Sequence, residues 1–303
     1  MSEPHLTVCY ITNRRFPCVQ WFIDSLRREM ETDADRDKIK IIVVDFYHDE
    51  HPDSLPAHVL HVPPKPCVWN GPHRLTTKDY FAASNARNTG ICLAPDGWIA
   101  YVDDLSVLLP GWLACVRQAM REGYMVCGAY RKVYGLEVTD GVVQSFVDYK
   151  QGHDSRWHGG SDKEAVKHGA GILFGCSLAG PVETFLAVNG WEEKCDGMGH
   201  EDVVMGTVLT KRGVEMRYDR RMMTYEAEEL HHTGTPMVRV DKKMVRYKDA
   251  SHAILDEAAK GDGRSKNALD IRALRARVLA GEPFPIPTEP TKHWPDGQYL
   301  STM

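Results

Sequence analysis

No apolar run in the sequence approaches the roughly 18 residues that a membrane-spanning helix needs. The first residues also lack the basic stretch followed by an apolar one that marks a secretory signal. Internal repeats are absent as well. We therefore expect a soluble protein that stays in the cytoplasm and has no membrane partner.

The eight cysteines contain no C-x-x-C pair and follow no regular spacing. Most of them stand inside apolar runs, where cysteine behaves as a small hydrophobic residue. We expect reduced thiols in a cytosol-like compartment.

Neither sign of charge dominates the chain. There are 37 Lys and Arg against 42 Asp and Glu, and the net charge of −5 argues against strong non-specific binding to DNA. Hydrophobic residues make up 43% and charged residues 26%, which excludes a disordered, collagen-like or coiled-coil chain. A chain of 303 residues can bury a large core, so we expect one large domain or two fused ones.

The first half alternates strand-like apolar runs with segments of helical spacing. Strands are expected over residues 6–12, 39–45, 59–62 and 98–103, and helices over 19–31, 78–93 and 112–121. This alternation predicts an α/β fold with a mostly parallel sheet that is covered on both faces. Ligands bind beyond the carboxyl ends of such strands, so Thr12, Asp45 and the pair Asp103–Asp104 should face one crevice.

The second half has shorter and more varied elements. Two strand-like runs surround the turn formers Gly135 and Asp140–Gly141 and predict an antiparallel ribbon over residues 124–148. Residues 151–169 show no periodicity and predict a long loop, either a mobile exposed segment or a lid over a ligand. Further elements are expected as helices over 182–188 and 201–212 and strands over 215–219 and 222–226.

The C-terminal part differs in charge from the rest. Residues 238–277 carry 11 Lys and Arg against 6 Asp and Glu, so this stretch is basic although the whole chain is acidic. The last stretch, 281–303, is rich in proline and should wrap the surface.

Asp103 and Asp104 stand at the end of the strand over 98–103. Two carboxylates in such a place suit a hard cation, because Mg²⁺ and Mn²⁺ take oxygen ligands and are often held by one or two protein groups plus phosphates. A helix cap or a solvated turn explains the pair equally well on its own.

A second acidic pair, Glu201 and Asp202, opens the helix over 201–212. The helix dipole favours acidic residues there, so the pair need not be functional. Glycines just before it, within residues 197–199, allow the backbone to approach a ligand closely, and a carboxylate there could act as a general base. The tandem His231–His232 could complete a mixed Asp/His site, although single histidines are more often structural.

In this order, the segments resemble the GT-A glycosyltransferases. The first half resembles the inverting family 2: its Val-Val-Asp-Asp, Ala-Arg-Asn-x-Gly, hydrophobic-Asp-Asp-Asp and Pro-x-Trp-Leu motifs match residues 42–45, 86–90, 102–104 and 110–113. The second half resembles the metal-dependent galactosyltransferases, whose Gly-Trp-Gly-x-Glu-Asp motif corresponds to residues 197–202. The resemblance covers about residues 6–232.

The resemblance implies a Rossmann-like GT-A domain with a mostly parallel central sheet and a smaller antiparallel ribbon. Residues 1–122 would form the half that binds the nucleotide-sugar, and residues 123–235 the acceptor and catalytic half of the same domain. Residues 236–303 would add a basic helical and Pro-rich C-terminal extension.

The resemblance also implies which residues bind the donor and the metal. Thr12 and Asp45 would contact the nucleotide base and Asp103 would lie beside the ribose. The donor-binding residues would be Thr12, Asp45, Arg87, Asn88 and Asp103. Mn²⁺ or Mg²⁺ would be held by Asp104 and His231, or by His232 in place of His231.

The catalytic residues implied by the resemblance are Asp202, as the general base, and Glu201, which assists it. Residues that could form a lid or an acceptor surface are Arg156, Trp157, His158, Met198 and His200. Three positions depart from the family patterns. Leu105 and Phe46 replace an Asp, and Met198 replaces the Trp that neighbours the acceptor sugar, so the galactosyltransferase acceptor is not carried over.

The expected activity is a metal-dependent, inverting transfer of a hexose from a nucleotide-sugar, such as a UDP-sugar, to a hydroxyl of a glycan, protein or small molecule. An alternative acceptor is viral DNA with hydroxymethylated pyrimidines, because the basic stretch 239–248 could contact phosphates. A non-catalytic nucleotide-sugar-binding protein is another alternative, since Leu105 breaks one motif. A sugar-nucleotide-forming nucleotidyltransferase is disfavoured, because residues 13–16 are not the Gly-rich loop of such enzymes.

Overall fold

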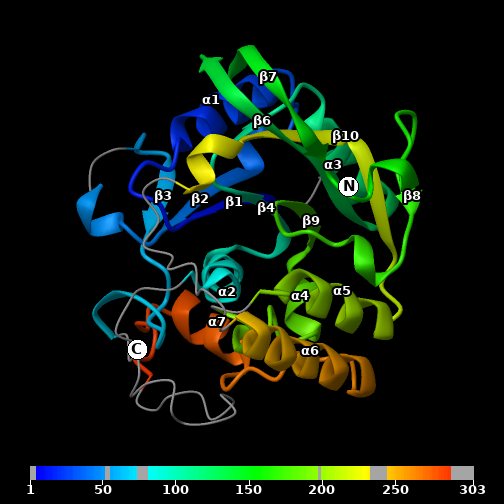
Figure 1. Ribbon diagram of the computed structural model, residues 1–303. Helices are drawn as coiled ribbons and strands as arrows, with labels where there is room; N and C mark the ends of the chain where they lie inside the picture. The colour runs from blue at the N-terminus through cyan, green and yellow to red at the C-terminus, as the bar shows by residue number, and fades with distance from the viewer. Residues whose placement is uncertain (1–4, 52–54, 74–80, 197–198, 233–243, 288–303) are drawn as a thin grey trace.

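The computed structural model describes residues 5–51, 55–73, 81–196, 199–232 and 244–287, and these form one mixed sheet of ten strands with helices on both sides (Figure 1). The strands are β1 (His5–Thr12), β2 (Ile39–Asp45), β3 (Val59–Val62), β4 (Gly97–Asp103), β5 (Ser106–Leu108), β6 (Met125–Thr139), β7 (Val142–His153), β8 (Val166–Lys167), β9 (Ser177–Pro181) and β10 (Met216–Ala227). The helices are α1 (Val19–Glu31), α2 (Ala83–Leu93), α3 (Trp112–Glu122), α4 (Val182–Ala187), α5 (Glu201–Lys211), α6 (Met244–Lys260) and α7 (Ile271–Leu279).

The sheet has the order β3-β2-β1-β4-β9-β6-β10-β5, with β7 paired to β6 and β8 to β10. Strands β1 to β4 are parallel neighbours, as the alternation of strands and helices predicts. The second half is mixed, because β9 is antiparallel to β4 and β6 while β10 is parallel to β6. Figure 1 shows α1 and α3 on one side of the sheet and α2, α4, α5, α6 and α7 on the other.

The side chains of β1 contribute to a hydrophobic core on each face of the sheet. Leu6, Val8 and Tyr10 pack with residues of α1 and α3, and Cys9 and Ile11 pack with residues of α2. Successive residues of a strand point to opposite faces. A strand that is apolar at almost every position is therefore what a sheet covered on both sides requires.

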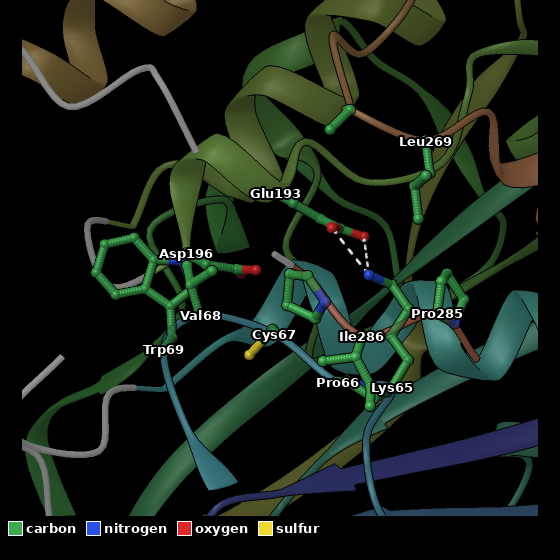
Figure 2. Close-up of a pocket in the computed structure, with 12 residues that line it drawn as sticks. Lys65, Pro66, Cys67, Val68, Trp69, Glu193, Asp196, Leu269, Pro285 and Ile286 are labelled. Atoms are coloured by element: carbon green, nitrogen blue, oxygen red, sulfur yellow. Dashed lines mark hydrogen bonds and ion pairs between the residues drawn. The ribbon is translucent and has the colours of Figure 1, made fainter. Parts of the chain in front are cut away.

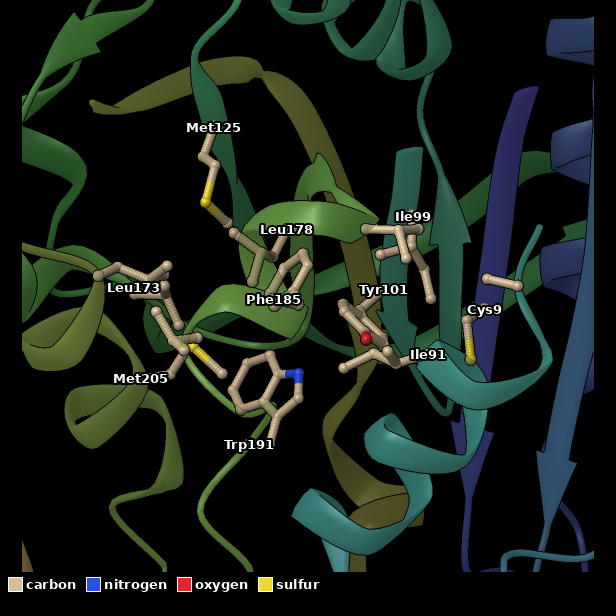
Figure 3. Close-up of a cluster of buried hydrophobic side chains, with 14 of the residues drawn as sticks. Cys9, Ile91, Ile99, Tyr101, Met125, Leu173, Leu178, Phe185, Trp191 and Met205 are labelled. Carbon is tan, nitrogen blue, oxygen red and sulfur yellow. The ribbon is translucent and has the colours of Figure 1, made fainter. Parts of the chain in front are cut away.

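The larger core contains an aromatic group around Tyr101 of β4 (Figure 3). The Tyr101 ring meets the rings of Phe185 and Trp191 edge-on, with centroid distances of 5.6 Å in both cases. Ile271 and Leu274 of α7 are buried in this same core. The described part of the C-terminal extension is thus built into the α/β domain.

The ribbon of β6 and β7 turns later than the sequence predicts. The turn lies at Asp140–Gly141, where both residues have positive φ, as in the type I′ turns that suit hairpins. Gly135 also has positive φ, but it lies inside β6, next to a register shift between Tyr134 and Glu137. Gly135, which the sequence suggests as a turn residue, therefore lies at a β-bulge.

Other predicted elements differ in their bounds. A single strand, β10, replaces the two strands expected over 215–226, because the chain continues across a register shift between Asp219 and Met223. The expected loop over 151–169 includes the end of β7 and the whole of β8. Helix α2 begins at Ala83, and residues 78–80 of the helix expected there lie outside the described residues.

All eight cysteines are free thiols, and seven of them are buried, as their apolar neighbours predict. Among the described residues, no helix is both long and apolar enough to cross a membrane.

Candidate active site

The strands that carry the predicted site residues end at the same edge of the sheet. In the parallel register, Thr12 of β1 lies opposite Asp45 of β2, and Ile11 lies opposite Asp103 of β4. Asp104 follows directly, before a turn in which Leu105 has a φ of 60°. The predicted grouping of these residues at one edge is confirmed.

Arg87 of α2 joins three carboxylates from two distant segments of the chain, the end of β4 and the start of α5. Its guanidinium, whose side chain is only 2% exposed, donates to Asp103 Oδ1 at 2.9 Å and to Glu201 Oε1 at 3.2 Å. Asp202 Oδ1 lies 3.8 Å from Arg87 Nη1. The guanidinium also lies over the ring of Trp191, 4.5 Å from its centroid. The arginine predicted at the nucleotide therefore holds together the carboxylates of Asp103, Glu201 and Asp202.

Gly175 makes room for this arginine. A Cβ atom at residue 175 would come within 2.3–2.8 Å of three guanidinium atoms of Arg87. The backbone N–H of Gly175 also donates to Asp202 Oδ1 at 2.9 Å. Gly175 was not among the predicted site residues, although a single glycine inside an apolar run is a signal of close backbone approach.

One guanidinium faces three carboxylates, so the cluster has more negative than positive charge. Burial raises the pKa of Asp202 to about 8, the nearby Glu201 carboxylate acts in the same direction, and Arg87 opposes both. Burial also raises the pKa of Asp103, again against the effect of Arg87. Because the Asp202 side chain is 22% exposed, a ligand can reach it. A carboxyl group with a pKa near the working pH is suited to proton transfer.

Asp104 has a positively charged neighbour that the sequence analysis missed. Arg14, two residues after the end of β1, donates from Nε to Asp104 Oδ2 at 2.9 Å, and the Thr12 hydroxyl donates to the same oxygen at 3.0 Å. Arg14 Nη1 also donates to the carbonyl oxygen of Leu230 at 3.0 Å. No sequence motif marks this arginine; only its position beside Thr12 hints at a role.

Among the described residues, no group of three or more His, Cys, Asp or Glu side chains is placed to hold a metal ion. His231 and His232 lie in a 3₁₀ helix, Glu228–His232, but their side chains are outside what the structure describes. Since a guanidinium and a hydroxyl already contact one oxygen of Asp104, the described residues do not fit a divalent cation there.

Asp45, predicted at the nucleotide base, is buried and holds two histidines. Its Oδ2 lies 3.0 Å from His51 Nδ1 and 3.0 Å from His61 Nε2, and its Oδ1 accepts the Tyr47 backbone N–H at 2.8 Å. His61 Nδ1 is buried without a hydrogen-bond partner. No sequence motif predicts this arrangement, because the fold brings Asp45, His51 and His61 together.

Asn88, also predicted at the nucleotide, contacts the protein itself. Its amide nitrogen donates to the Trp191 carbonyl oxygen at 2.9 Å and to Glu193 Oε1 at 2.7 Å, and its oxygen accepts the Trp191 N–H at 2.8 Å. These bonds fix the segment that carries Trp191, whose ring lies under the Arg87 guanidinium. Asn88 therefore contributes to the site indirectly, by holding Trp191 in place against Arg87.

The residues predicted as a lid occupy different environments. The Arg156 guanidinium is paired with Asp154 at 2.8 Å and lies 4.2 Å from the centroid of the Phe174 ring, in a buried position. Trp157 is half-buried and lies beside Arg220, while His158 is exposed. Arg156 therefore packs inside the domain, and closure of this segment over a donor stays a prediction.

His200, predicted for a lid or an acceptor surface, lies at the start of α5. His200 precedes the helix with a φ of 68°, and its ring centroid is 5.1 Å from that of His252 in α6. Met198 lies outside the described residues.

A pocket of about 320 Å³ lies beside the N-terminus of α2 (Figure 2). Asp196 lines it and accepts the backbone N–H groups of Ser84 and Asn85 at 2.8 and 3.2 Å, so this carboxylate caps the helix that carries Arg87. A buried ion pair between Lys65 and Glu193, at 2.9 Å, forms another wall. The other lining residues are Pro66, Cys67, Val68, Trp69, Ala268, Leu269, Pro285, Ile286 and Pro287.

Neither a protein-family model nor a curated protein sequence matches the chain. Its structure is similar to the crystal structure of S. aureus TarS, with a TM-score of 0.52 and 12% identity over 91% of this chain and 42% of that one. A structure of S. aureus TarS 1–349 in complex with UDP gives a TM-score of 0.51 and 11% identity over 91% and 70% of the two chains. The chain thus spans less than half the length of the first of these structures. At such low identity the likeness shows the fold alone. The protein has the GT-A fold that the motifs predict, with a helical C-terminal extension.

Proposed function

We propose that the protein is an inverting glycosyltransferase that moves a hexose from a UDP-sugar to a hydroxyl of a glycan, protein or small molecule. The observation that supports this most is the cluster in which Arg87 holds Asp103, Glu201 and Asp202 together at the carboxyl edge of the sheet. The fold, and the UDP complex of a structural neighbour, agree with a nucleotide-sugar donor.

In this proposal Asp202 removes the proton of the acceptor hydroxyl. The acceptor oxygen forms the new bond to the anomeric carbon, and the bond from that carbon to the diphosphate oxygen breaks on the opposite face, with its electron pair leaving on the diphosphate. One displacement inverts the anomeric centre. Because the diphosphate is a good leaving group, no protein acid is needed. Arg87 and the Gly175 N–H keep the Asp202 carboxylate in position.

A panel of UDP-, GDP- and TDP-hexoses tests the proposal, with release of nucleoside diphosphate and transfer to a saccharide acceptor as readouts. Asp202→Asn should bind the donor as the wild type does and lose about 10²- to 10⁴-fold in turnover, because an amide cannot accept the proton. A product that keeps the anomeric configuration of the donor would exclude the mechanism. So would full turnover in Asp202→Asn.

The DNA acceptor rests on the basic stretch 239–248. Residues 239–243, and the side chains of 244–248, lie outside what the structure describes. This alternative therefore stays a prediction from the sequence, and it shares the donor site proposed above.

A further inference from the structure

Arg14 lies between two segments to which the sequence patterns assign metal ligands. Its Nε contacts Asp104 after β4, and its Nη1 contacts the carbonyl oxygen of Leu230, the residue just before His231. One guanidinium thus connects the strand end and the 3₁₀ helix that a bound cation was expected to connect.

The position of Arg14 is fixed by its neighbours. The Arg14 backbone N–H donates to Thr12 Oγ1 at 3.1 Å, and that hydroxyl donates in turn to Asp104. The Arg14 and Asp104 side chains are only 9% and 11% exposed. A buried charge pair of this kind is screened little by solvent, so breaking it is costly. The guanidinium is therefore part of the site and not a surface charge that happens to lie near it.

The charge of Arg14 conflicts with a divalent cation on the same carboxylate. A cation bound to Asp104 would lie close to a guanidinium that is 2.9 Å from the carboxylate oxygen, and like charges in a buried place repel strongly. In contrast, a guanidinium alone suits a diphosphate, because its planar set of N–H donors matches phosphate oxygens and its charge does not depend on pH.

We infer that Arg14 takes the place of the divalent cation: it binds the donor diphosphate and neutralises the negative charge that develops when the bond to the anomeric carbon breaks. This inference rests on the proposed glycosyl transfer. A diphosphate oxygen replaces the Leu230 carbonyl as acceptor of Nη1, and Asp104 keeps Nε and so holds the guanidinium in orientation. No proton moves at Arg14, and Asp202 takes the proton of the acceptor. The reaction needs no metal ion.

Transfer by the wild type in excess EDTA, compared with transfer in Mn²⁺ or Mg²⁺, tests the inference without any variant. Turnover should agree within about twofold in all three conditions, since the cation is part of the chain. Turnover that needs Mn²⁺ or Mg²⁺ overturns the inference and leaves the proposed function standing. Absence of turnover and of donor binding in every condition would instead overturn the proposed function, and this inference with it.

Variants of Arg14 add a second test. Arg14→Ala should lose at least about 100-fold in turnover, as expected for removal of a charge aimed at the transition state. Arg14→Lys keeps the charge and the ion pair with Asp104 and should keep more turnover than Arg14→Ala. Added Mn²⁺ should partly rescue Arg14→Ala, because Asp104 is then open to a cation, while it leaves the wild type unchanged. A purely structural role of Arg14 would not change the response to metal.

Arg15→Ala is the matched control. Arg15 is the next residue, its side chain is 57% exposed, and it pairs with Glu50 on the surface. Turnover of this variant should stay within about twofold of the wild type, because exposed ion pairs contribute little. Equal losses in Arg14→Ala and Arg15→Ala would mean that the net charge of the loop matters and would overturn the specific role of Arg14.

Discussion

Gly175 lies directly against the guanidinium of Arg87, so close that a Cβ atom at residue 175 would be 2.3 Å from Arg87 Nη2. The same glycine donates its N–H to Asp202, which Arg87 also faces. One residue without a side chain therefore sets the position of both the arginine and the proposed base.

Gly175→Ala should displace Arg87 and lower kcat/KM by about 10²-fold, because a shift of about 1 Å in a catalytic group has effects of this size. The donor dissociation constant should change much less than turnover. Steady-state kinetics and donor titration would measure the two effects.

Gly171→Ala provides the control for that experiment. Gly171 lies nearby in the sequence, but a Cβ atom there would meet nothing within 4 Å. Its kinetics should stay within about twofold of the wild type. A Gly175→Ala variant that is equally active would show that Arg87 can shift without consequence, and the proposed cluster would lose its support.

The local sequence was informative where a single segment decides the structure. Strands β1, β2 and β4 consist of apolar residues at almost every position, and the polar residues at their ends, Thr12, Asp45 and Asp103, mark the edge of the sheet where the site lies. The acidic residues Glu201 and Asp202 were found because they open a helix after a glycine cluster.

Contacts between distant segments could not be predicted in the same way. Arg87 reaches Glu201 across 114 positions, and Arg14 reaches Asp104 across 90. Each of these residues, taken alone, fits a surface position. These ion pairs can be recognised only once the fold is known. The contact between Asn88 and Trp191 also joins distant segments. Asn88 was therefore assigned to the nucleotide, although its amide forms hydrogen bonds with the backbone of Trp191.

Asn88→Ala should destabilise the protein by about 2–4 kcal/mol, because it leaves the buried N–H of Trp191 without an acceptor and removes two further hydrogen bonds. Thermal or denaturant unfolding would measure this loss. Gln144→Ala, which removes a similar amide from an exposed strand position, should change stability by less than about 0.5 kcal/mol. Unchanged stability together with lost donor binding would instead favour the direct nucleotide contact that the resemblance implies.

If the acceptor is DNA, affinity should fall steeply with salt, because each phosphate contact releases about one counterion. Replacing Lys242, Lys243 and Lys248 by Gln should reduce the slope of log K against log salt by roughly three units. A matched variant with Gln at the exposed positions of Lys163, Lys167 and Lys260 should keep the slope. Absence of DNA binding at low salt, or equal slopes in both variants, would leave a saccharide, protein or small molecule as the acceptor.

The raised pKa of Asp202 predicts how activity depends on pH. A general base works only without its proton, so kcat/KM should rise with pH and level off above about pH 8, far above the range of an ordinary carboxyl group. Glu201→Gln removes the negative neighbour that helps to raise this pKa, so the rise should move to lower pH. A rise that stays in place in this variant would show that Glu201 does not act on Asp202.

The same raised pKa predicts how stability depends on pH. The unfolded chain loses the Asp202 proton near pH 4, whereas the folded protein keeps it until about pH 8, so the folded state binds more protons between these values. The free energy of unfolding should therefore fall as pH rises across this window. Asp202→Asn has no such proton, so the stability of this variant should depend less on pH. The variant should be more stable than the wild type, most clearly above about pH 8.

Urea unfolding of both proteins near pH 5 and pH 9 measures the difference in stability. Parallel pH dependence in the two proteins would mean that Asp202 is ionised in the folded state at neutral pH, and the raised pKa of this carboxyl group would be excluded.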